Sequence, residues 1–149
     1  MTMPQDPSDF PARLRRAVGR LSRRLRQTHA GADLTPSQYE VLVTLVQHSP
    51  LRHAELAALE SLNPTMLSRV VGKLEARGLA TRLADDADGR VVHVAVTKEG
   101  RDLVARVRKE RADVLRAALR TLTDEDVRAL EAALPALEVL TESLKGESA

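Results

Sequence analysis

The sequence predicts a mainly helical protein that carries one small two-stranded β element, which places it in the mainly α, α+β fold class. Three observations support this prediction. Apolar residues recur at steps of three and four over most of the chain, and proline or glycine stands where these runs begin and end. A polar Asp-Gly turn separates two short runs, the second of them rich in valine. The length of 149 residues favours one domain, residues 1–149, with room for an aliphatic core.

Composition excludes several classes of protein. The chain has no cysteine, which excludes a disulfide scaffold, a Cys-ligated metal site and thiol chemistry. Aromatic residues make up 1% of the chain, so base-stacking single-strand binding and aromatic ligand cages have little support. No uncharged apolar run approaches the roughly 20 residues of a membrane span, and the polar start of the chain does not resemble a signal peptide. We therefore expect a soluble, cytoplasmic protein with no membrane partner.

The first two helices follow from spacing and capping. Residues 8–29 place their apolar side chains in one narrow stripe, which is typical of a coiled-coil seam. The members of this stripe are Phe10, Leu14, Val18, Leu21 and Leu25. The second helix begins after Thr35, because Pro36 fits a first helical turn and Gln38 completes a capping box with Thr35. It is expected to end near Pro50.

Two further helices and a hairpin come next. A short helix is expected over residues 53–60, and a longer one over 63–77 starts at an Asn63 cap and stops at Gly78. Strands are predicted at residues 81–84 and 91–96, with the Asp88-Gly89 turn between them. The region 81–96 is therefore a hairpin.

Two long helices complete the chain. Thr97 caps a helix that runs to about residue 120, and Thr123 begins the last one. The last helix alternates apolar steps of three and four residues. Pro135 falls inside this pattern and is expected to kink the helix or to remove one hydrogen bond.

Residues 35–96 together have the pattern of a winged helix-turn-helix. The helix over 63–77 has one apolar side and one polar, lightly basic side. The polar side holds Thr65, Ser68, Arg69, Gly72, Lys73 and Ala76. In a DNA major groove, Arg69 and Lys73 suit guanine edges, and the hydroxyl side chains reach bases or phosphates. The alternative is an ordinary amphipathic surface helix, and the neighbouring hairpin favours the DNA-binding interpretation.

The hairpin tip combines three aspartates with one arginine. Asp88 and Arg90 stand on either side of Gly89, so the carboxylate can hold the guanidinium in one orientation. An arginine held in this way can enter a narrow minor groove, where the potential is most negative. Two alternatives are that the aspartates solvate a turn or form a calcium loop, although a calcium loop would need a bidentate glutamate at its twelfth position.

Several segments resemble the MarR family of winged helix-turn-helix transcriptional regulators. They are LTPSQYEVL (34–42), ELA (55–57), LSRVVGKLEARGL (67–79), DGR (88–90) and VAVTKEG (94–100). The resemblance extends over about residues 8–146. It implies a recognition helix at 63–77 and a wing at 81–96, with Arg90 as the minor-groove arginine and Asp88 as the residue that positions it. Arg52 stands where the family often has a Thr or Ser cap, and it is a candidate for a phosphate contact.

The resemblance also implies a DNA-facing set of residues and a triangular homodimer. The DNA-facing residues are Arg52, Thr65, Ser68, Arg69, Lys73, Arg77, Arg82, Asp88 and Arg90. The N-terminal and C-terminal helices, 8–29 and 97–146, are the dimerisation helices. Their expected interface residues are Phe10, Leu14, Leu21, Leu130, Leu134, Leu137 and Leu144.

Charge favours the same pairing of the chain ends. Residues 1–29 hold seven arginines and two aspartates, a net charge of +5, whereas residues 121–149 have a net charge of −5. Both ends carry leucine seams that a small winged domain does not cover. Apolar burial is expected to stabilise the pairing, and charge to select which helices meet. The alternative is a monomer whose helices close on each other.

A small anionic or phenolic effector is a further partner that the resemblance implies. The crevice would draw on Arg16, Arg20 and Tyr39, although these arginines equally suit pairing with the acidic last helix. The four histidines have no metal-ligand spacing within a helix, so neither a metal nor another cofactor is expected. The sequence contains no nucleophile elbow, phosphate loop or paired-carboxylate pattern, so we expect no enzymatic activity.

These features predict a sequence-specific, duplex-DNA-binding transcriptional regulator. The resemblance favours a ligand-responsive repressor that acts as a homodimer on a pseudo-palindromic operator. A winged-helix protein–protein adaptor without DNA binding is the alternative. An enzyme with a helical dimerisation domain is a weaker alternative, because the chain leaves little room for a catalytic part.

Overall fold

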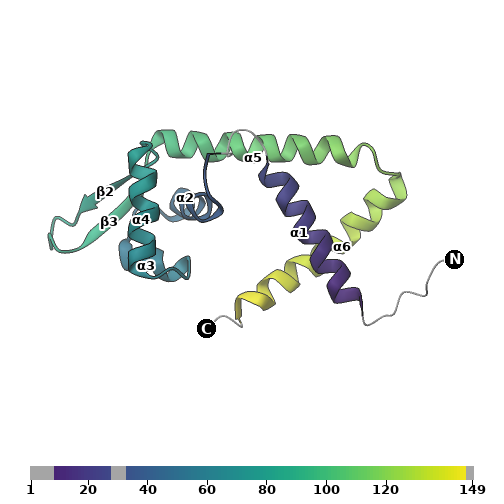
Figure 1. Cartoon of the computed structure of the whole chain (residues 1–149), viewed down its shortest axis with the longest axis horizontal. Coiled ribbons are helices and arrows are strands. Elements are labelled where there is room, and N and C mark those ends of the chain that lie inside the picture. Colours follow the sequence, from purple (N-terminus) through teal and green to yellow (C-terminus); the bar gives the residue numbers. More distant parts are fainter. Residues whose placement is uncertain (1–8, 28–32, 147–149) are drawn as a thin grey trace. The chain divides into compact units, whose positions relative to one another are not determined.

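The computed structural model describes residues 9–27 and 33–146, with side chains to residue 144, and the chain divides into two compact units between Arg111 and Ala112. The described part contains six helices and one three-stranded sheet (Figure 1). In chain order the elements are α1 (Phe10–Arg26), α2 (Pro36–His48), β1 (Leu51–Arg52), α3 (His53–Leu59), α4 (Pro64–Ala76), β2 (Ala80–Ala84), β3 (Val92–Val96), α5 (Lys98–Leu119) and α6 (Asp124–Gly146). The predicted order of elements is confirmed.

The predicted two-stranded wing is formed by β2 and β3, and β1 adds to it a third strand that the sequence did not predict. The strand order is β1-β3-β2, and both pairings are antiparallel. β1 pairs Leu51 with Val94 and Arg52 with His93. A strand of two residues is too short to show an alternating pattern, and it forms here because the outer edge of β3 offers free backbone hydrogen-bonding groups.

The hairpin pairs β2 with β3 from Ala80↔Val96 to Ala84↔Val92. Its strands begin and end within one residue of the predicted bounds. The Asp85 backbone N–H donates to the Val91 carbonyl, which closes the turn at the base of the wing tip.

Two helix starts have the predicted caps. The Thr35 hydroxyl accepts from the Gln38 backbone N–H at 3.2 Å, and the Gln38 side chain accepts from the Thr35 backbone N–H at 3.0 Å. At the start of α4, the Asn63 side chain accepts from the Met66 backbone N–H at 2.8 Å. These bonds satisfy amide groups that have no partner within a helix, so they fix where α2 and α4 begin.

The core of the first unit is aliphatic and is built from α2, α3, α4, β3 and the first half of α5. Its fully buried large side chains are Val41, Leu42, Leu45, Leu56, Leu67, Val71, Leu74, Val94, Val104 and Val107. Three of these come from the predicted apolar side of the 63–77 helix, so α4 turns its other side outward.

A close contact joins the start of α5 to the turn between α4 and β2. The Thr97 hydroxyl donates to the Gly78 carbonyl at 2.6 Å and accepts from the Gly100 backbone N–H at 3.1 Å. The Thr97 backbone N–H donates to the Leu79 carbonyl at 3.1 Å. Gly100 is buried, and a Cβ added there would lie 2.2 Å from the Leu79 carbonyl oxygen. The helix can therefore approach this turn only at a residue without a side chain.

The second unit comprises the end of α5 and all of α6. α6 continues through Pro135 as one helix, with the proline lacking the backbone N–H that would donate one hydrogen bond. Among the described helices, none combines the length and apolar character needed to span a membrane.

Candidate nucleic-acid interface

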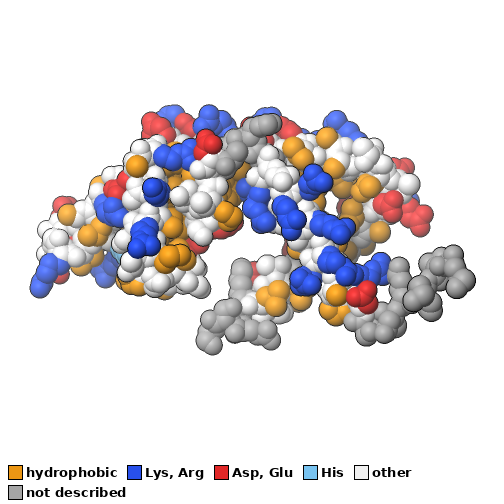
Figure 2. Space-filling model, in the orientation of Figure 1, with side chains coloured by type: hydrophobic (Ala, Val, Ile, Leu, Met, Phe, Trp, Pro, Cys, Tyr) orange, Lys and Arg blue, Asp and Glu red, His pale blue; other side chains and the backbone are white. Residues whose placement is uncertain are grey.

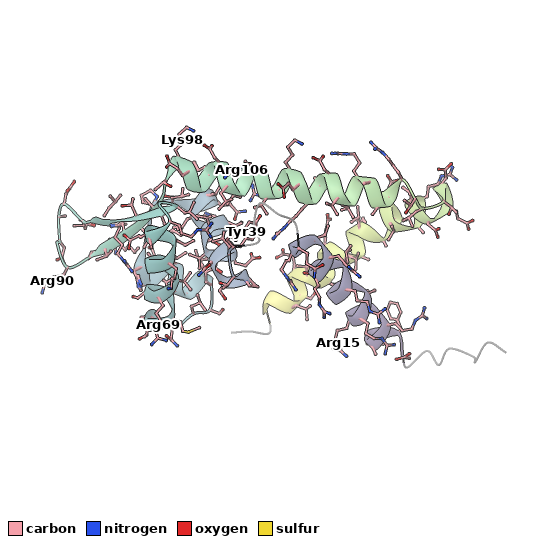
Figure 3. The ribbon with its side chains drawn as sticks, turned by 45° about the horizontal axis from the view of Figure 1, so that its top comes forward. Arg15, Tyr39, Arg69, Arg90, Lys98 and Arg106 are labelled. Atoms are coloured by element: carbon pink, nitrogen blue, oxygen red, sulfur yellow. The ribbon has the colours of Figure 1, made fainter. Side chains whose placement is uncertain are left out.

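The outward side of α4 carries polar and basic side chains that other residues leave uncovered. Thr65, Ser68, Arg69 and Lys73 are all exposed. Figure 3 shows Arg69 at the edge of the first unit that lies opposite α5, and Figure 2 shows Lys and Arg side chains gathered over α4 and at the wing tip. Within the described ranges, no hydrogen bond or ion pair engages the side chains of Arg69 or Lys73. Both cations are therefore available to an external acceptor.

Gly72 lies in the middle of this side of α4, where the packing of the protein itself does not require a glycine. A Cβ added at Gly72 would meet nothing within 4 Å. Glycine inside a helix costs about 1 kcal/mol relative to alanine, so its presence calls for another reason. Close approach of an external surface to the backbone is such a reason.

We expect Gly72→Ala to raise the free energy of unfolding by up to about 1 kcal/mol, because the new methyl group meets open space and alanine favours the helix. The same methyl group would stand between the helix and a bound duplex, so duplex affinity should fall about fivefold or more. Urea unfolding and fluorescence anisotropy would measure the two effects. Unchanged duplex affinity would contradict a close approach at this position.

Arg82 connects the wing to α4 and does not point freely outward. Its guanidinium forms an ion pair with Glu75, and its Nη2 donates to the Ser68 carbonyl at 3.0 Å. Its backbone N–H donates to the Glu75 carboxylate at 3.0 Å. In this structure Arg82 holds the hairpin against the recognition-helix candidate, and the DNA contact expected of it stays a prediction.

Arg77 is also engaged within the chain. It caps the C-terminal end of α4, and its Nη1 donates to the Asp33 carbonyl at 3.2 Å. Its Nη2 lies 3.9 Å from the Asp33 carboxylate. The structure therefore joins Arg77 to the segment before α2, and the DNA contact predicted for it gains no support.

The wing tip keeps Arg90 outward and holds Asp85 and Asp88 in hydrogen bonds to its own backbone. The Arg90 side chain is 93% exposed, and its Nε lies 3.3 Å from the Asp88 carboxylate, which also accepts from the Arg90 backbone N–H at 3.0 Å. The Asp85 carboxylate accepts from the backbone N–H groups of Ala87 and Asp88, and these bonds hold the pKa of Asp85 below its usual value. His93 adds a smaller effect in the same direction, with its Nδ1 3.8 Å from the Asp85 carboxylate. The tip therefore presents a guanidinium whose orientation is restricted before any partner arrives (Figure 3).

A groove runs between the start of α3, the start of α4 and the wing. Its lining residues are Arg52, His53, Ala54, Pro64, Ser68, Arg82, Arg90, Val91 and Val92. The start of α3 has Arg52 in place of the Thr or Ser cap that is common in the family. Instead, the Glu55 side chain within the helix accepts from the Arg52 backbone N–H at 3.0 Å. The Ser68 Oγ lies 3.1 Å from His53 Nε2. His53 was not among the predicted site residues, and no local pattern could reveal a contact that tertiary packing creates.

A second concave site surrounds Tyr39, and it differs from the predicted effector crevice. It is lined by Arg26, Leu34, Thr35, Pro36, Tyr39, Glu40 and Arg111. The Arg111 guanidinium lies 4.3 Å from the centre of the Tyr39 ring, and its buried Nε has no hydrogen-bond partner among the described residues.

The structure does not bring the predicted combination of Arg16, Arg20 and Tyr39 together in one pocket. Arg16 and Arg20 line a separate depression along α1, and Arg16 pairs with Asp9 at 3.4 Å. The arginine beside Tyr39 comes from α5, whose position relative to α2 is not readable from sequence spacing. Among the described residues, no three His, Asp or Glu side chains come together in a way that could hold a metal ion.

Comparisons with known proteins agree with this geometry. A MarR family model matches residues 34–92. An HTH-type transcriptional regulator of Mycobacterium bovis is 35% identical over 106 residues, which cover 71% of this chain and 74% of that protein. The HTH-type transcriptional repressor MdtR of Bacillus subtilis is 26% identical over 120 residues, 80% of this chain and 77% of MdtR.

Solved structures show the same fold. MepR, a transcription regulator of the Staphylococcus aureus multidrug efflux pump MepA, superposes with a TM-score of 0.75 over 89% of this chain and 98% of MepR. A MepR mutant bound to an oligodeoxyribonucleotide superposes with a TM-score of 0.69 over 89% of this chain and 97% of that chain. Both are 19% identical to this chain, so they establish the fold alone.

Proposed function

The chain belongs to the MarR family and is a DNA-binding transcriptional regulator, and from this premise we propose that it is a homodimeric repressor of a pseudo-palindromic operator whose DNA binding responds to a small anionic ligand. The observation that carries the proposal is the pair of uncovered cations on α4 beside a wing tip that presents Arg90. The recognition helix would enter the major groove, and the wing would reach the adjacent minor groove.

The repressor role draws its support from a relative. MdtR is named a transcriptional repressor, and its similarity to this chain extends over 80% of the present sequence. A protein that occupies promoter DNA represses by exclusion and needs no further enzymatic part. Repression is therefore the simplest outcome of the proposed binding.

The proposed homodimer rests on apolar faces that the chain itself leaves uncovered. No residue of α1 is buried, and none of residues 124–144 of α6 is buried. Exposed side chains include Phe10, Leu21, Leu130, Leu134 and Leu144, at 49–63% of their full exposure. Helices with such faces bury them against a partner, and a second copy supplies the complementary charge of its opposite end. Leu14 and Leu137, which are half-buried, complete the proposed interface.

Selection of bound sequences from random duplex DNA tests the function as a whole. We expect a two-fold symmetric motif with half-site centres about 10 base pairs apart, together with steep weakening of affinity at higher salt. Sedimentation should give about twice the chain mass of 16.3 kDa. A protein–protein adaptor would yield no motif, and its partner binding would not compete with duplex DNA.

Arg90→Ala should weaken binding most on operators with A·T-rich flanks, because a narrow minor groove attracts an inserted arginine most strongly. Competition between duplexes that differ only in their flanks would measure this preference. Asp86→Ala is the matched control, since it alters charge at the same exposed tip without removing the arginine. An unchanged preference for A·T-rich flanks in Arg90→Ala would exclude the minor-groove role.

The proposed effector site is the pocket around Tyr39. Its buried Arg111 Nε–H lacks an acceptor, and a ligand carboxylate would supply one through a charge-assisted hydrogen bond. The Tyr39 ring supplies an apolar wall for an aromatic acid. An anionic phenol therefore suits the pocket.

Arg111→Met should weaken binding of 4-hydroxybenzoate, used as the probe, by about tenfold or more, because a hydrogen bond to a charged group is lost. Isothermal titration calorimetry would measure the affinity. Arg16→Met is the control, and it should bind the probe as the unaltered protein does. If Arg16→Met lost binding of the probe and Arg111→Met kept it, the effector site would lie at the arginines of α1.

A further inference from the structure

The hydrogen bond between His53 and Ser68 joins an ionisable ring to the exposed face of α4. The Ser68 Oγ lies 3.1 Å from His53 Nε2, and both side chains line the groove beside the wing. The two residues are 15 positions apart and belong to α3 and α4, so neither helix requires this bond for its own stability. A hydroxyl group both donates and accepts, whereas a neutral imidazole has one donating and one accepting nitrogen and an imidazolium donates from both.

We propose that His53 is a positioning residue for base recognition, which sets whether Ser68 offers the DNA a hydrogen-bond acceptor or a donor. The inference rests on the proposed function of α4 in DNA binding. With a neutral ring whose proton is on Nδ1, the Ser68 O–H donates to His53 Nε2, and only oxygen lone pairs face the groove. Ser68 then suits an adenine or cytosine amino group.

Protonation reverses the polarity of this pair. The imidazolium Nε2–H donates to Ser68 Oγ, which frees the hydroxyl proton to point outward. Ser68 then suits an acceptor oxygen of guanine or thymine. The ring itself contacts no base in this scheme and acts only through the hydroxyl group.

Charged groups of both signs surround the groove that holds His53 and Ser68. The charged residues at the groove and their partners are Arg52, Glu55, Glu75, Arg82, Asp88 and Arg90. Each of the three guanidinium groups has a carboxylate or a carboxylate-bound backbone nearby. Histidine is the side chain whose charge changes between about pH 5 and about pH 8, and the phosphates of a bound duplex favour its charged form.

The test compares selections from a random duplex pool at about pH 8 and about pH 6. We expect the unaltered protein to shift its preference about three- to tenfold at one symmetric pair of operator positions, from adenine or cytosine toward guanine or thymine. His53→Gln and Ser68→Ala should both lose this shift and keep the rest of the motif. His48→Gln, which alters an exposed histidine at the end of α2, should retain it.

Two results would overturn the inference. One is a shift that persists in His53→Gln. The other is a pH effect of equal size on every duplex, which would mean that the pair contacts only phosphate.

Nuclear magnetic resonance of the imidazole nitrogens tests the inference without DNA. In the free protein at about pH 8, His53 should carry its proton on Nδ1, because Nε2 accepts from Ser68, and Ser68→Ala should remove this preference. A proton on Nε2 in the unaltered protein would contradict the scheme. Because this measurement needs no duplex, it separates failure of the positioning role from failure of the proposed function.

Discussion

Gly100→Ala is expected to destabilise the protein by about 3 kcal/mol, although alanine favours a helix over glycine. The added Cβ would lie 2.2 Å from the Leu79 carbonyl oxygen and 2.8 Å from a methyl group of Val96. A backbone carbonyl cannot swing aside as a flexible side chain does, so α5 or the turn before β2 must move. That movement would also disturb the Thr97 hydrogen bonds that hold the turn. Urea unfolding at fixed protein concentration would measure the loss.

Gly72→Ala is the matched control, since it makes the same substitution inside another helix of the same unit. Nothing lies within 4 Å of its added Cβ, so the two substitutions should change stability in opposite directions. Equal stability of Gly100→Ala and the unaltered protein would show that the contact between α5 and the turn gives way at little cost. The pair thus separates helix propensity from close packing.

Arg69→Ala is expected to weaken binding to the selected operator by about 1–3 kcal/mol, which is roughly fivefold to 150-fold, and to relax sequence preference at one position in each half-site. Arg69 is exposed on the outward side of α4 and has no partner among the described residues that its loss would disturb. Stability should therefore change little. Anisotropy titrations against the operator and its single-base variants would measure both affinity and preference.

Arg77→Ala provides a control on the same helix. Because Asp33 already engages its guanidinium, its removal should alter operator affinity by less than the removal of Arg69. If Arg69→Ala weakened binding equally on all duplexes, Arg69 would contact phosphate and the base contact would be wrong. If Arg77→Ala had the larger effect, the proposed orientation of α4 on the duplex would be wrong.

Residues of the same type in the same motif received different roles from the tertiary structure. Arg69, Arg77 and Arg82 all belong to the predicted DNA-facing set, and composition does not distinguish them. Asp33 and Glu75 engage two of them, and only packing brings these carboxylates within reach. The His53–Ser68 bond and the Arg111–Tyr39 contact arise in the same way, from helices that are distant in sequence.

The sequence alone determined the order of the helices, the caps at Thr35 and Asn63, the buried side of α4 and the hairpin turn, because each depends on residues within a few positions of one another. Only the tertiary structure decided that a third strand joins the sheet, which arginines remain available, and which glycine lies against a carbonyl. These outcomes depend on contacts between segments that are distant in the sequence. The structural propensities of single residues and short segments do not include the energies of such contacts.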